Sequence, residues 1–479
     1  MLAKWWIEQI EQDFEKHHLP AIQEYLRVPS ISATGEGIQE TAEMTAKTLT
    51  KLGAENIQIV PTKGWPVVYG ELITNPQKPT VLFYSMYDVQ PVEPEKWIVP
   101  PFEGAIVENF EEMGRALVAR GVINTKGPTM AFFQTVKTLI DTKKELPVNL
   151  IFVLEGEEEL GSIHLPDFVN KYEQHLEKAD VVYFPSFSES LNGRIETSLG
   201  CRGVIYFKIW MQGGNWGGPR SRNIHSSLSS FVDSPTWRLI DLLSKMRAPN
   251  GKILIPGIYD KVLPPTKDDE LLIQNLVQKL DFEEIKRMLD VKKFYLDDDN
   301  NEISKEKFVR QLFTPCLTID GIISGYTEEA GSKTVLPCSA FTNMDIRLVP
   351  NMEVDDIKMK IANFIKNNAP NAKFEMEEGY RWAKTSPSHP YVKGHLELLE
   401  STGKDMLIWP MGTGSVPFYI FQEKFNLPII RGGLGHGARA HSPNEFVFLE
   451  SKTGAGGIID FEISVCKLLL KIGEIGKIK

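Results

Sequence analysis

The sequence predicts an α/β protein whose main sheet carries helices on both faces and whose middle section is an inserted α+β block. Three observations predict this. Apolar runs of strand length alternate with helical patterns over residues 1–205. After Arg202-Gly203, partly alternating strands and Gly-rich loops replace that pattern. After residue 386, the sequence again resembles the first section, with apolar strand-length runs and a terminal apolar helix.

The first section is built from helices and strands in alternation. Apolar residues recur at helical period over 4–27, and Gly53 stops a second helical pattern. The expected elements are helices at 4–27 and 37–52, strands at 57–60, 67–73 and 81–87, a helix at 129–142, a strand at 148–154, a helix at 165–175 and a strand at 181–184.

The remaining elements divide into the middle block and a carboxyl-terminal section. Asp233-Ser234-Pro235 is typical of a helix start, with an N-cap side chain followed by proline in the first turn. The expected elements are a strand at 204–211, a helix ending near 246, charged helices over 267–312, a β-rich piece at 316–350, a helix at 353–367, strands at 372–377 and 428–430, and a terminal helix at 454–473.

Composition excludes several classes of partner. The chain has 479 residues, 42% hydrophobic and 24% charged, with a net charge of −10, which disfavours nucleic acid and anionic membranes as partners. No apolar run approaches the length of a membrane span, and the amino-terminal segment lacks the pattern of a signal peptide. The 4 cysteines lie far apart without a CxxC pair, so a reducing, cytoplasmic location is expected.

The most informative stretch is Ile151–Ser162, where a strand ends in three consecutive glutamates. Three adjacent carboxylates repel one another, so a cation, a proton or a substrate must offset the cost if they are buried. A solvated acidic turn is the ordinary alternative. Because ligands of open α/β sheets bind just past the strand ends, the position favours a functional site at Glu157, Glu158 and Glu159.

Five motifs follow one another in an order that resembles the M20 family of zinc peptidases and amidohydrolases, in particular its carnosinase-like dipeptidase branch. Supporting stretches occur at 28–32, 332–340 and 345–351, so the resemblance covers nearly the whole chain. The motifs are YDVQP from Tyr87, RGVINTKGP from Arg120, EGEEELGS from Glu155, NIHSS from Asn223 and AHSPNE from Ala440.

The resemblance implies a two-domain architecture. A catalytic α/β sheet domain would comprise residues 1–205 and 386–479, and an inserted α+β lid domain, residues 206–385, would mediate homodimerisation. It also implies a pair of zinc ions that share a bridging carboxylate, with a glutamate that deprotonates a metal-held water for attack on an amide carbonyl.

The resemblance assigns a role to each matching position. Glu158 would be the general base, and Glu159 and His441 would be metal ligands. Asp88 would orient the first histidine ligand, and His225 would stabilise the oxyanion in the partner's site. Arg347, Ser415 and Gly414 would bind the substrate.

The chain departs from the family pattern at the metal ligands. Met86 stands where the family has a histidine, Asn124 where it has the bridging aspartate, and Ser186 where it has a further aspartate; Thr125 replaces a second aspartate beside Asn124. Thioether, amide and hydroxyl groups carry no charge and bind zinc poorly. We therefore expect no binuclear zinc site, and either no metal or at most one weakly bound zinc at Glu159 and His441.

The retained residues favour an M20-fold enzyme that acts on an amide or peptide-type bond of a small dipeptide-like or N-acyl amino acid substrate. The alternatives are a non-catalytic binding or scaffold protein, and a metal-independent non-hydrolytic enzyme such as a lyase, isomerase or acyl transferase. Individual residues could also have other roles. Arg347 could pair with a structural acid, His225 could cap the segment after it, and His436 could replace a lost ligand.

Overall fold

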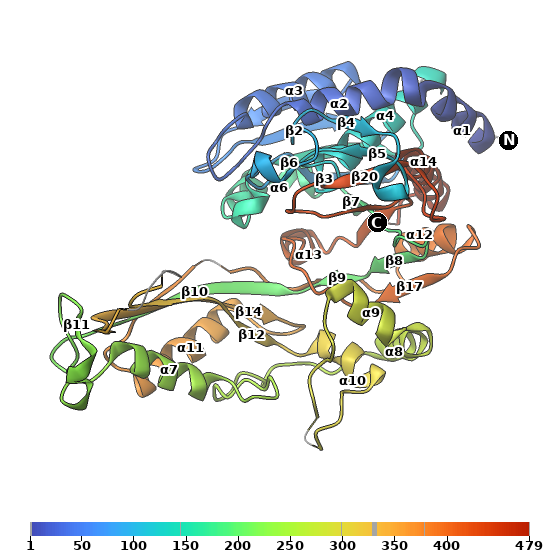
Figure 1. The fold of residues 1–479 in the computed structure, drawn as a ribbon. Coiled ribbons are helices and arrows are strands. Elements are labelled where there is room, and N and C mark those ends of the chain that lie inside the picture. Colours follow the sequence, from blue (N-terminus) through green and yellow to red (C-terminus); the bar gives the residue numbers. More distant parts are fainter. Residues whose placement is uncertain (1, 144, 298, 328–332, 378, 479) are drawn as a thin grey trace. The chain divides into compact units, whose positions relative to one another are not determined.

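The computed structural model of the chain describes residues 2–143, 145–297, 299–327, 333–377 and 379–478, and it contains two compact units (Figure 1). Unit 1 comprises Met1–Leu199, Thr385–Trp409 and Ile420–Lys479. Unit 2 comprises Gly200–Lys384 and Pro410–Tyr419. The short piece Pro410–Tyr419 belongs to unit 2 because backbone hydrogen bonds join Gly412 to Gly200 and Arg202 to Gly414.

Unit 1 is built on a six-stranded mixed sheet of order β1-β2-β6-β3-β7-β18. The strands β6, β3, β7 and β18 run parallel, whereas β1 and β2 are antiparallel to their neighbours. Every residue of β3 and β6 is buried, as expected for strands covered on both faces. The strands are β1 Glu55–Val60, β2 Val67–Leu72, β3 Thr80–Met86, β6 Asn149–Glu155, β7 Val181–Phe187 and β18 Ile429–Gly433.

Helices cover both faces of this sheet, which confirms the predicted α/β class. Phe83 stacks on Phe132 of α4, whereas the next residue, Tyr84, packs against Phe421 of α13 on the opposite face. The helices of unit 1 are α1 Leu2–Asp13, α2 Leu19–Arg27, α3 Ile38–Lys51, α4 Lys126–Lys143, α5 Leu165–Lys171, α6 Glu173–Leu176, α12 Pro390–Glu400, α13 Tyr419–Phe425 and α14 Ile458–Ile475, with the first residue of α13 lying in unit 2.

Unit 1 also contains short strands that the sequence did not predict. A second sheet, of order β19-β20-β5-β4, packs around Phe110, Phe446 and Phe448. Two further strands form a parallel pair. These strands are β4 Ala105–Val107, β5 Gly114–Val118, β19 Gly437–Ala438 and β20 Phe446–Ser451 in the sheet, and β8 Ile195–Ser198 with β17 Met406–Trp409 in the pair.

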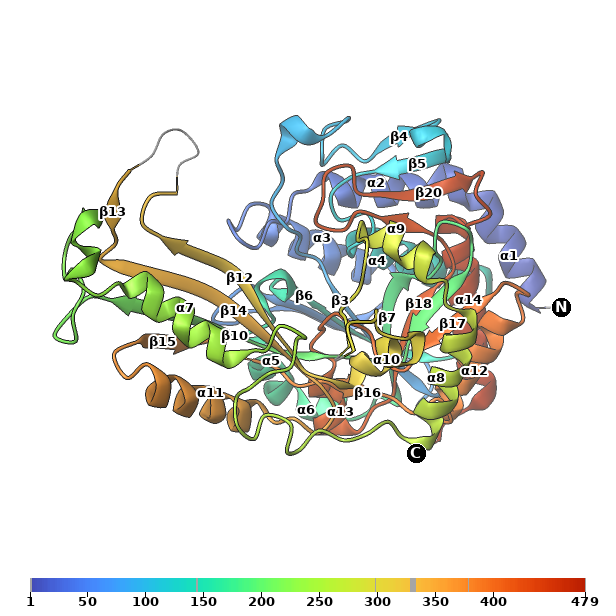
Figure 2. The same ribbon diagram turned by 60° about the horizontal axis from the view of Figure 1, so that its bottom comes forward.

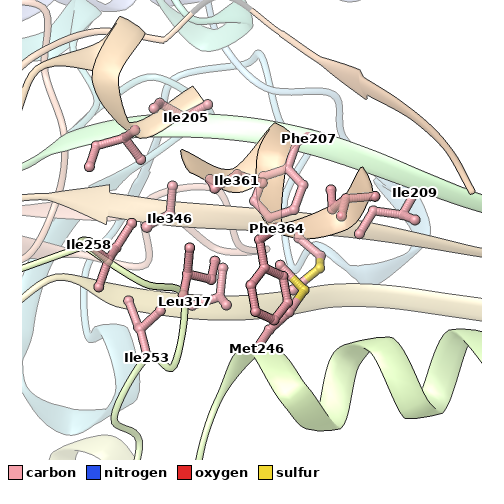
Figure 3. Packing of buried hydrophobic residues seen from close by; sticks show 14 of the residues in the cluster. Ile205, Phe207, Ile209, Met246, Ile253, Ile258, Leu317, Ile346, Ile361 and Phe364 are labelled. Atoms are coloured by element: carbon pink, nitrogen blue, oxygen red, sulfur yellow. The ribbon is translucent and has the colours of Figure 1, made fainter. Parts of the chain in front are cut away.

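Unit 2 carries a four-stranded antiparallel sheet of order β12-β14-β10-β15. Alternate residues of β10, such as Ile205, Phe207 and Ile209, enter an apolar core that the helices α7 and α11 complete on one face of the sheet (Figures 2 and 3). The elements are β10 Gly203–Gln212, β12 Cys316–Ser324, β14 Ser339–Leu348, β15 Lys373–Met376, α7 Pro235–Met246 and α11 Val354–Asn368.

The rest of unit 2 consists of short elements outside this sheet. The helices α8 Lys267–Lys279, α9 Phe282–Leu289 and α10 Lys305–Arg310 occupy the segment predicted to be charged and helical. Two strand pairs join β9 Gly200–Cys201 to β16 Ala383–Lys384, and β11 Ile224–His225 to β13 Val335–Leu336. Within the described ranges, no helix of either unit is both long and apolar enough to cross a membrane.

Candidate active site

The carboxyl ends of the parallel strands of unit 1 converge on the acidic turn. Met86, the last residue of β3, lies level with Glu155, the last residue of β6. Ser186 lies one residue before the end of β7, which runs parallel to β3. Met86 and Ser186 therefore lie at the same edge of the sheet as the triple glutamate, as the predicted ligand positions require.

Asn124, Glu159 and His441 meet at this edge. Asn124 Nδ2 lies 2.8 Å from Glu159 Oε1 and 3.0 Å from His441 Nε2. His441 Nε2 lies 3.0 Å from the same Glu159 oxygen, and Gln90 donates to Glu159 Oε2 at 2.9 Å. Both oxygens of a carboxylate whose side chain is only 5% exposed thus face N–H groups.

Glu445 fixes the loop that carries Asn124. Its side chain is fully buried and accepts hydrogen bonds from the backbone amides of Gly121, Ile123 and Asn124 at 2.9–3.1 Å. The Arg120 guanidinium donates to the same carboxylate at 2.7 Å. The peptide bond between Asn124 and Thr125 is cis. Four donors on one carboxylate hold this loop in a single arrangement beside Glu159.

Asp88 supports the backbone of the acidic turn. Its two oxygens accept the backbone N–H groups of Glu158 and Glu159 at 3.2 and 3.0 Å. Complete burial, and secondarily the charge of Glu159, raise the pKa of Asp88 to about 7. The residue expected to orient a histidine therefore braces the turn instead.

The buried surroundings raise the pKa values of the Glu155 and Glu158 carboxyl groups. Burial, followed by the charges of Glu159, Asp88 and Glu155, raises the pKa of Glu158 well above its ordinary value. Burial raises the pKa of Glu155 to about 8, although the Tyr84 hydroxyl donates to it and Ser162 Oγ does so at 3.0 Å. Groups with such pKa values can exchange protons with a substrate at neutral pH.

The side chains at this edge do not fit a pair of zinc ions. Two adjacent divalent cations require anionic ligands, whereas Met86, Asn124 and Ser186 are neutral. Both oxygens of Glu159 already accept hydrogen bonds from Gln90 and Asn124, so a cation would compete with these donors. Within the described part of the chain, no three or more His, Cys, Asp or Glu side chains are grouped as a metal site.

The predicted substrate-binding residues Arg347 and Ser415 contact each other in unit 2. Arg347 Nη1 donates to Ser415 Oγ at 2.9 Å, and its Nε donates to the buried Asp345 at 2.8 Å. Gly414 is held by its carbonyl, which accepts the backbone N–H of Arg202 at 3.0 Å. Arg347 therefore pairs with an acid, as its structural alternative predicted, and its role towards a substrate stays a prediction.

His225 is exposed in unit 2 and caps the segment that follows it, as its structural alternative predicted. Its Nδ1 accepts the backbone N–H of Ser227 at 3.2 Å, and its Nε2 lies 3.2 Å from Thr334 Oγ1.

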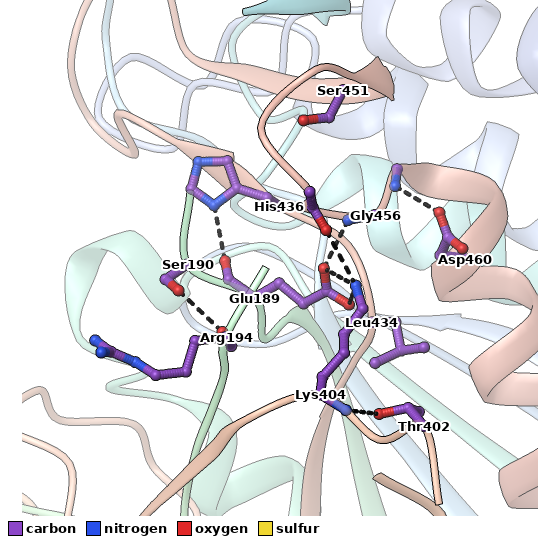
Figure 4. A network of polar contacts seen from close by, with 12 residues as sticks. Glu189, Ser190, Arg194, Thr402, Lys404, Leu434, His436, Ser451, Gly456 and Asp460 are labelled. Atoms are coloured by element: carbon purple, nitrogen blue, oxygen red, sulfur yellow. Dashed lines mark hydrogen bonds and ion pairs between the residues drawn. The ribbon is translucent and has the colours of Figure 1, made fainter. Parts of the chain in front are cut away.

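Another buried network holds the loops after β7 and β18 in unit 1 (Figure 4). Both oxygens of the fully buried Glu189 contact Lys404 Nζ at 2.8 Å, and one of them accepts the backbone N–H of Gly456 at 2.6 Å. His436 Nδ1 lies 2.7 Å from the Glu189 carbonyl oxygen, and its ring packs beside Phe448. The His436 imidazole therefore packs within these loops rather than against Glu159.

Sequence reasoning missed three residues of the site. Gln90, Glu155 and Glu445 lie inside the quoted motifs YDVQP, EGEEELGS and AHSPNE, yet none received a role. Glu155 is the last residue of an apolar strand, and this position in the sequence indicates a buried acid. Nothing local indicates that Gln90 and Glu445 contact residues about 70 and 325 positions away, because only the folded chain brings them together.

The fold and this site place the chain in a known class. The model of peptidase family M20/M25/M40 matches residues 82–455, and the chain belongs to this family.

Individual relatives are similar over different lengths. The M20 family metallo-carboxypeptidase Sso-CP2 from Sulfolobus solfataricus superposes with a TM-score of 0.84 and 32% identity, over 96% of this chain and 99% of that one. The Cys-Gly metallodipeptidase dug1 of Schizosaccharomyces pombe is 28% identical over 88% of this chain and 90% of its own. The Beta-Ala-His dipeptidase of Mus musculus is 32% identical over 64% of this chain, which spans only 60% of that protein's length.

Proposed function

We propose that this protein acts on the amide or peptide-type bond of a small dipeptide-like or N-acyl amino acid ligand without a binuclear zinc site. At most one zinc ion would bind, weakly, at Glu159 and His441. The similar proteins named as dipeptidases or carboxypeptidases act on bonds of this kind, which supports the substrate class. The observation that carries the proposal is that both oxygens of Glu159 accept hydrogen bonds from side-chain amides, beside a Glu158 with a raised pKa.

Glu158 is the proposed general base. Its carboxylate would take a proton from a water molecule whose oxygen attacks the carbonyl carbon, and the protonated Glu158 would then deliver that proton to the leaving amine. The raised pKa of Glu158 makes its carboxylate a stronger base, which supports both proton transfers. His225 would stabilise the developing oxyanion, as the family resemblance implies.

Arg347, Ser415 and Gly414 are the proposed substrate-binding residues. Arg347 is already oriented by Asp345 and Ser415, so its guanidinium is pre-organised to receive a carboxylate. A free carboxylate on the ligand is accordingly part of the proposed substrate class.

The proposal extends to the assembly and the setting of the protein. We propose a homodimer formed through unit 2, whose helix α7 and edge strand β12 expose apolar residues including Trp237 at 70% and Ile323 at 59%. The net charge of −10 supports a protein that works without nucleic acid or anionic membranes. A cytoplasmic location is proposed from the cysteine pattern.

The same hydrogen-bond network favours a second candidate, a non-catalytic binding protein. A buried carboxylate whose two oxygens both accept hydrogen bonds from neighbouring amides needs no metal ion to be stable. In this candidate, the pocket would bind the same class of ligand without turnover.

Incubation of the purified protein with a panel of dipeptides and N-acyl amino acids, followed by mass spectrometry, separates the candidates. Hydrolysis yields two fragments whose summed mass exceeds that of the substrate by one water. A bound ligand returned unchanged supports the binding protein, and a product of unchanged mass indicates an isomerase. Absence of both binding and turnover across the panel would refute the proposed substrate class.

A further inference from the structure

We propose that Asn124 is the residue that keeps a divalent metal ion out of the Glu159–His441 position. The side-chain amide presents N–H groups at the point where a third metal ligand would have to present a lone pair. The inference rests on the proposed loss of the binuclear site, and it identifies which of the three substitutions controls the retained half of that site.

The orientation of the Asn124 amide follows from its partners. Asn124 Nδ2 lies 2.8 Å from Glu159 Oε1, and an ionised carboxylate can only accept hydrogen bonds. A flipped amide would bring two oxygens together at that distance. In the observed orientation, Asn124 Oδ1 accepts the Thr125 hydroxyl at 3.2 Å, so both ends of the amide have a partner.

The Asn124 amide occupies the position beside Glu159 and His441 that a metal ion would need. Asn124 Nδ2 and His441 Nε2 both approach Glu159 Oε1, and the two nitrogens lie 3.0 Å apart. Gln90 engages the other oxygen of the same carboxylate. A zinc ion would have to displace these N–H groups and would gain only a neutral amide oxygen as its third ligand.

The backbone around Asn124 resists rearrangement. The buried Glu445 carboxylate holds the amides of Ile123 and Asn124 at 2.9 and 3.1 Å, so the side chain begins from a fixed position. An aspartate built at residue 124 would therefore direct its carboxylate at the same point between Glu159 and His441. Two carboxylates and an imidazole are the ligand number of a catalytic zinc site.

Met86 and Ser186 do not control this position. They lie at the ends of β3 and β7, and none of the hydrogen bonds to the Glu159 carboxylate comes from either residue. Restoring ligands at both positions would leave the amide of Asn124 in contact with Glu159. The single substitution Asn124→Asp is thus expected to allow zinc to bind at Glu159 and His441, whereas substitutions at Met86 and Ser186 are not.

The test measures zinc affinity by isothermal titration calorimetry and zinc content by elemental analysis after dialysis. The proteins are the wild type, Asn124→Asp, Asn124→His, the double variant Met86→His/Ser186→Asp, and Asn444→Asp. The last is a matched control, since it makes the same amide-to-carboxylate change on the loop of His441 at a side chain that instead accepts the backbone N–H of Ile98. Circular dichroism verifies folding, and Asn124→His carries the test should Asn124→Asp not fold.

Asn124→Asp is expected to bind one zinc ion per chain. Since losing an outer partner of a metal ligand alone costs about 10–100-fold in affinity, gaining a direct charged ligand is expected to raise affinity at least about a hundredfold. The double variant and Asn444→Asp are expected to match the wild type at this position.

Two results would overturn this inference while leaving the proposed function intact. In the first, the wild type binds no zinc, and folded Asn124→Asp and Asn124→His bind none either. In the second, the double variant binds zinc as tightly as Asn124→Asp does. Tight zinc binding by the wild type would instead refute the proposed loss of the metal site.

Discussion

Glu158 and Glu159 are adjacent in the chain, but their side chains meet different surroundings. Glu159 faces the amides of Gln90 and Asn124, which donate hydrogen bonds to its carboxylate, and the His441 ring. Among the residues that the structure describes, no comparable set of donors surrounds the Glu158 carboxyl group. Burial and neighbouring carboxylates raise its pKa well above the ordinary value. The proposed proton-transfer role is therefore assigned to Glu158, whereas the Glu159 carboxylate holds the side chains of Gln90 and Asn124 in place.

Replacing Glu158 with glutamine tests this division of roles. Loss of a general base is expected to lower the turnover of any confirmed substrate about 10²–10⁴-fold, while ligand affinity stays close to that of the wild type. Glu157→Gln is the matched control, because Glu157 pairs with His164 at 2.9 Å and should be dispensable for turnover. Unchanged kinetics in Glu158→Gln would remove the proposed base.

Glu155 gives a pH dependence of stability. Its folded pKa of about 8 lies above the value of about 4.3 for an unfolded glutamate, so the folded state holds an extra proton between those values. The stability contributed by this proton is complete at low pH and is lost as pH rises through about 8. Glu155→Gln mimics the protonated form, so its melting temperature should gain on the wild type between pH 6 and pH 9. Parallel curves for the two proteins would show that Glu155 does not titrate in this range.

The Arg120–Glu445 pair is expected to dominate the stability of the Asn124 loop. Both side chains are at most 3% exposed, and Glu445→Gln leaves a buried guanidinium without its anion. The free energy of unfolding, measured in urea, should fall by about 3 kcal/mol. In the half-exposed pair between Arg115 and Glu15, Glu15→Gln should cost less than about 1 kcal/mol. Equal losses in the two variants would contradict the assigned role of Glu445.

At this scale, the sequence predicted where residues lie better than what they contact. Met86 and Ser186 do lie at the strand ends, and Asn124 does contact Glu159, because motif order and strand polarity determine position. The partners of Glu159 were not predictable from the sequence. Whether an asparagine accepts, donates or ligates depends on the orientation of its amide, which is set by partners that only the folded chain brings together, such as Glu159.

At the scale of secondary structure, long periodic segments were predicted and short ones were not. The helices α3, α7 and α11 and the buried strands β3 and β6 fall where periodicity and apolar runs indicated. The strands β4, β5, β19 and β20 were missed because each has six residues or fewer, and because the pairing of β20 with β5, which joins them into one sheet, links segments far apart in the sequence. The helix expected over 4–27 contains a π-helical turn at Phe14–His18, which places His18 Nδ1 2.7 Å from the buried Glu462 of α14.

The exposed apolar residues of α7 and β12 define the proposed dimer surface. Trp237→Glu on α7 would bury a charge at this surface, so the variant should be monomeric by light scattering at a concentration where the wild type is dimeric. Met359→Glu is the matched control, because Met359 is 55% exposed on α11, outside this surface. A wild type that is monomeric under the same conditions, or a dimeric Trp237→Glu, would refute the proposed interface.

At the scale of the whole molecule, the two units differ in how closely their residues match the family pattern. In unit 1, the acidic turn and its supporting loops remain ordered around Asp88 and Glu445, although the charged metal ligands expected nearby are absent. In unit 2, the Arg347–Ser415 contact that is proposed to bind a carboxylate is intact. Polar networks inside each unit therefore hold these side chains in place.

The zinc content of the purified wild-type protein, beside that of the triple variant Met86→His/Asn124→Asp/Ser186→Asp, tests the central claim most directly. After dialysis against metal-free buffer and readdition of zinc, the wild type should retain less than one zinc ion per chain. The triple variant, with the charged ligand set restored, should retain two. Two tightly bound zinc ions in the wild type would contradict the account of the site.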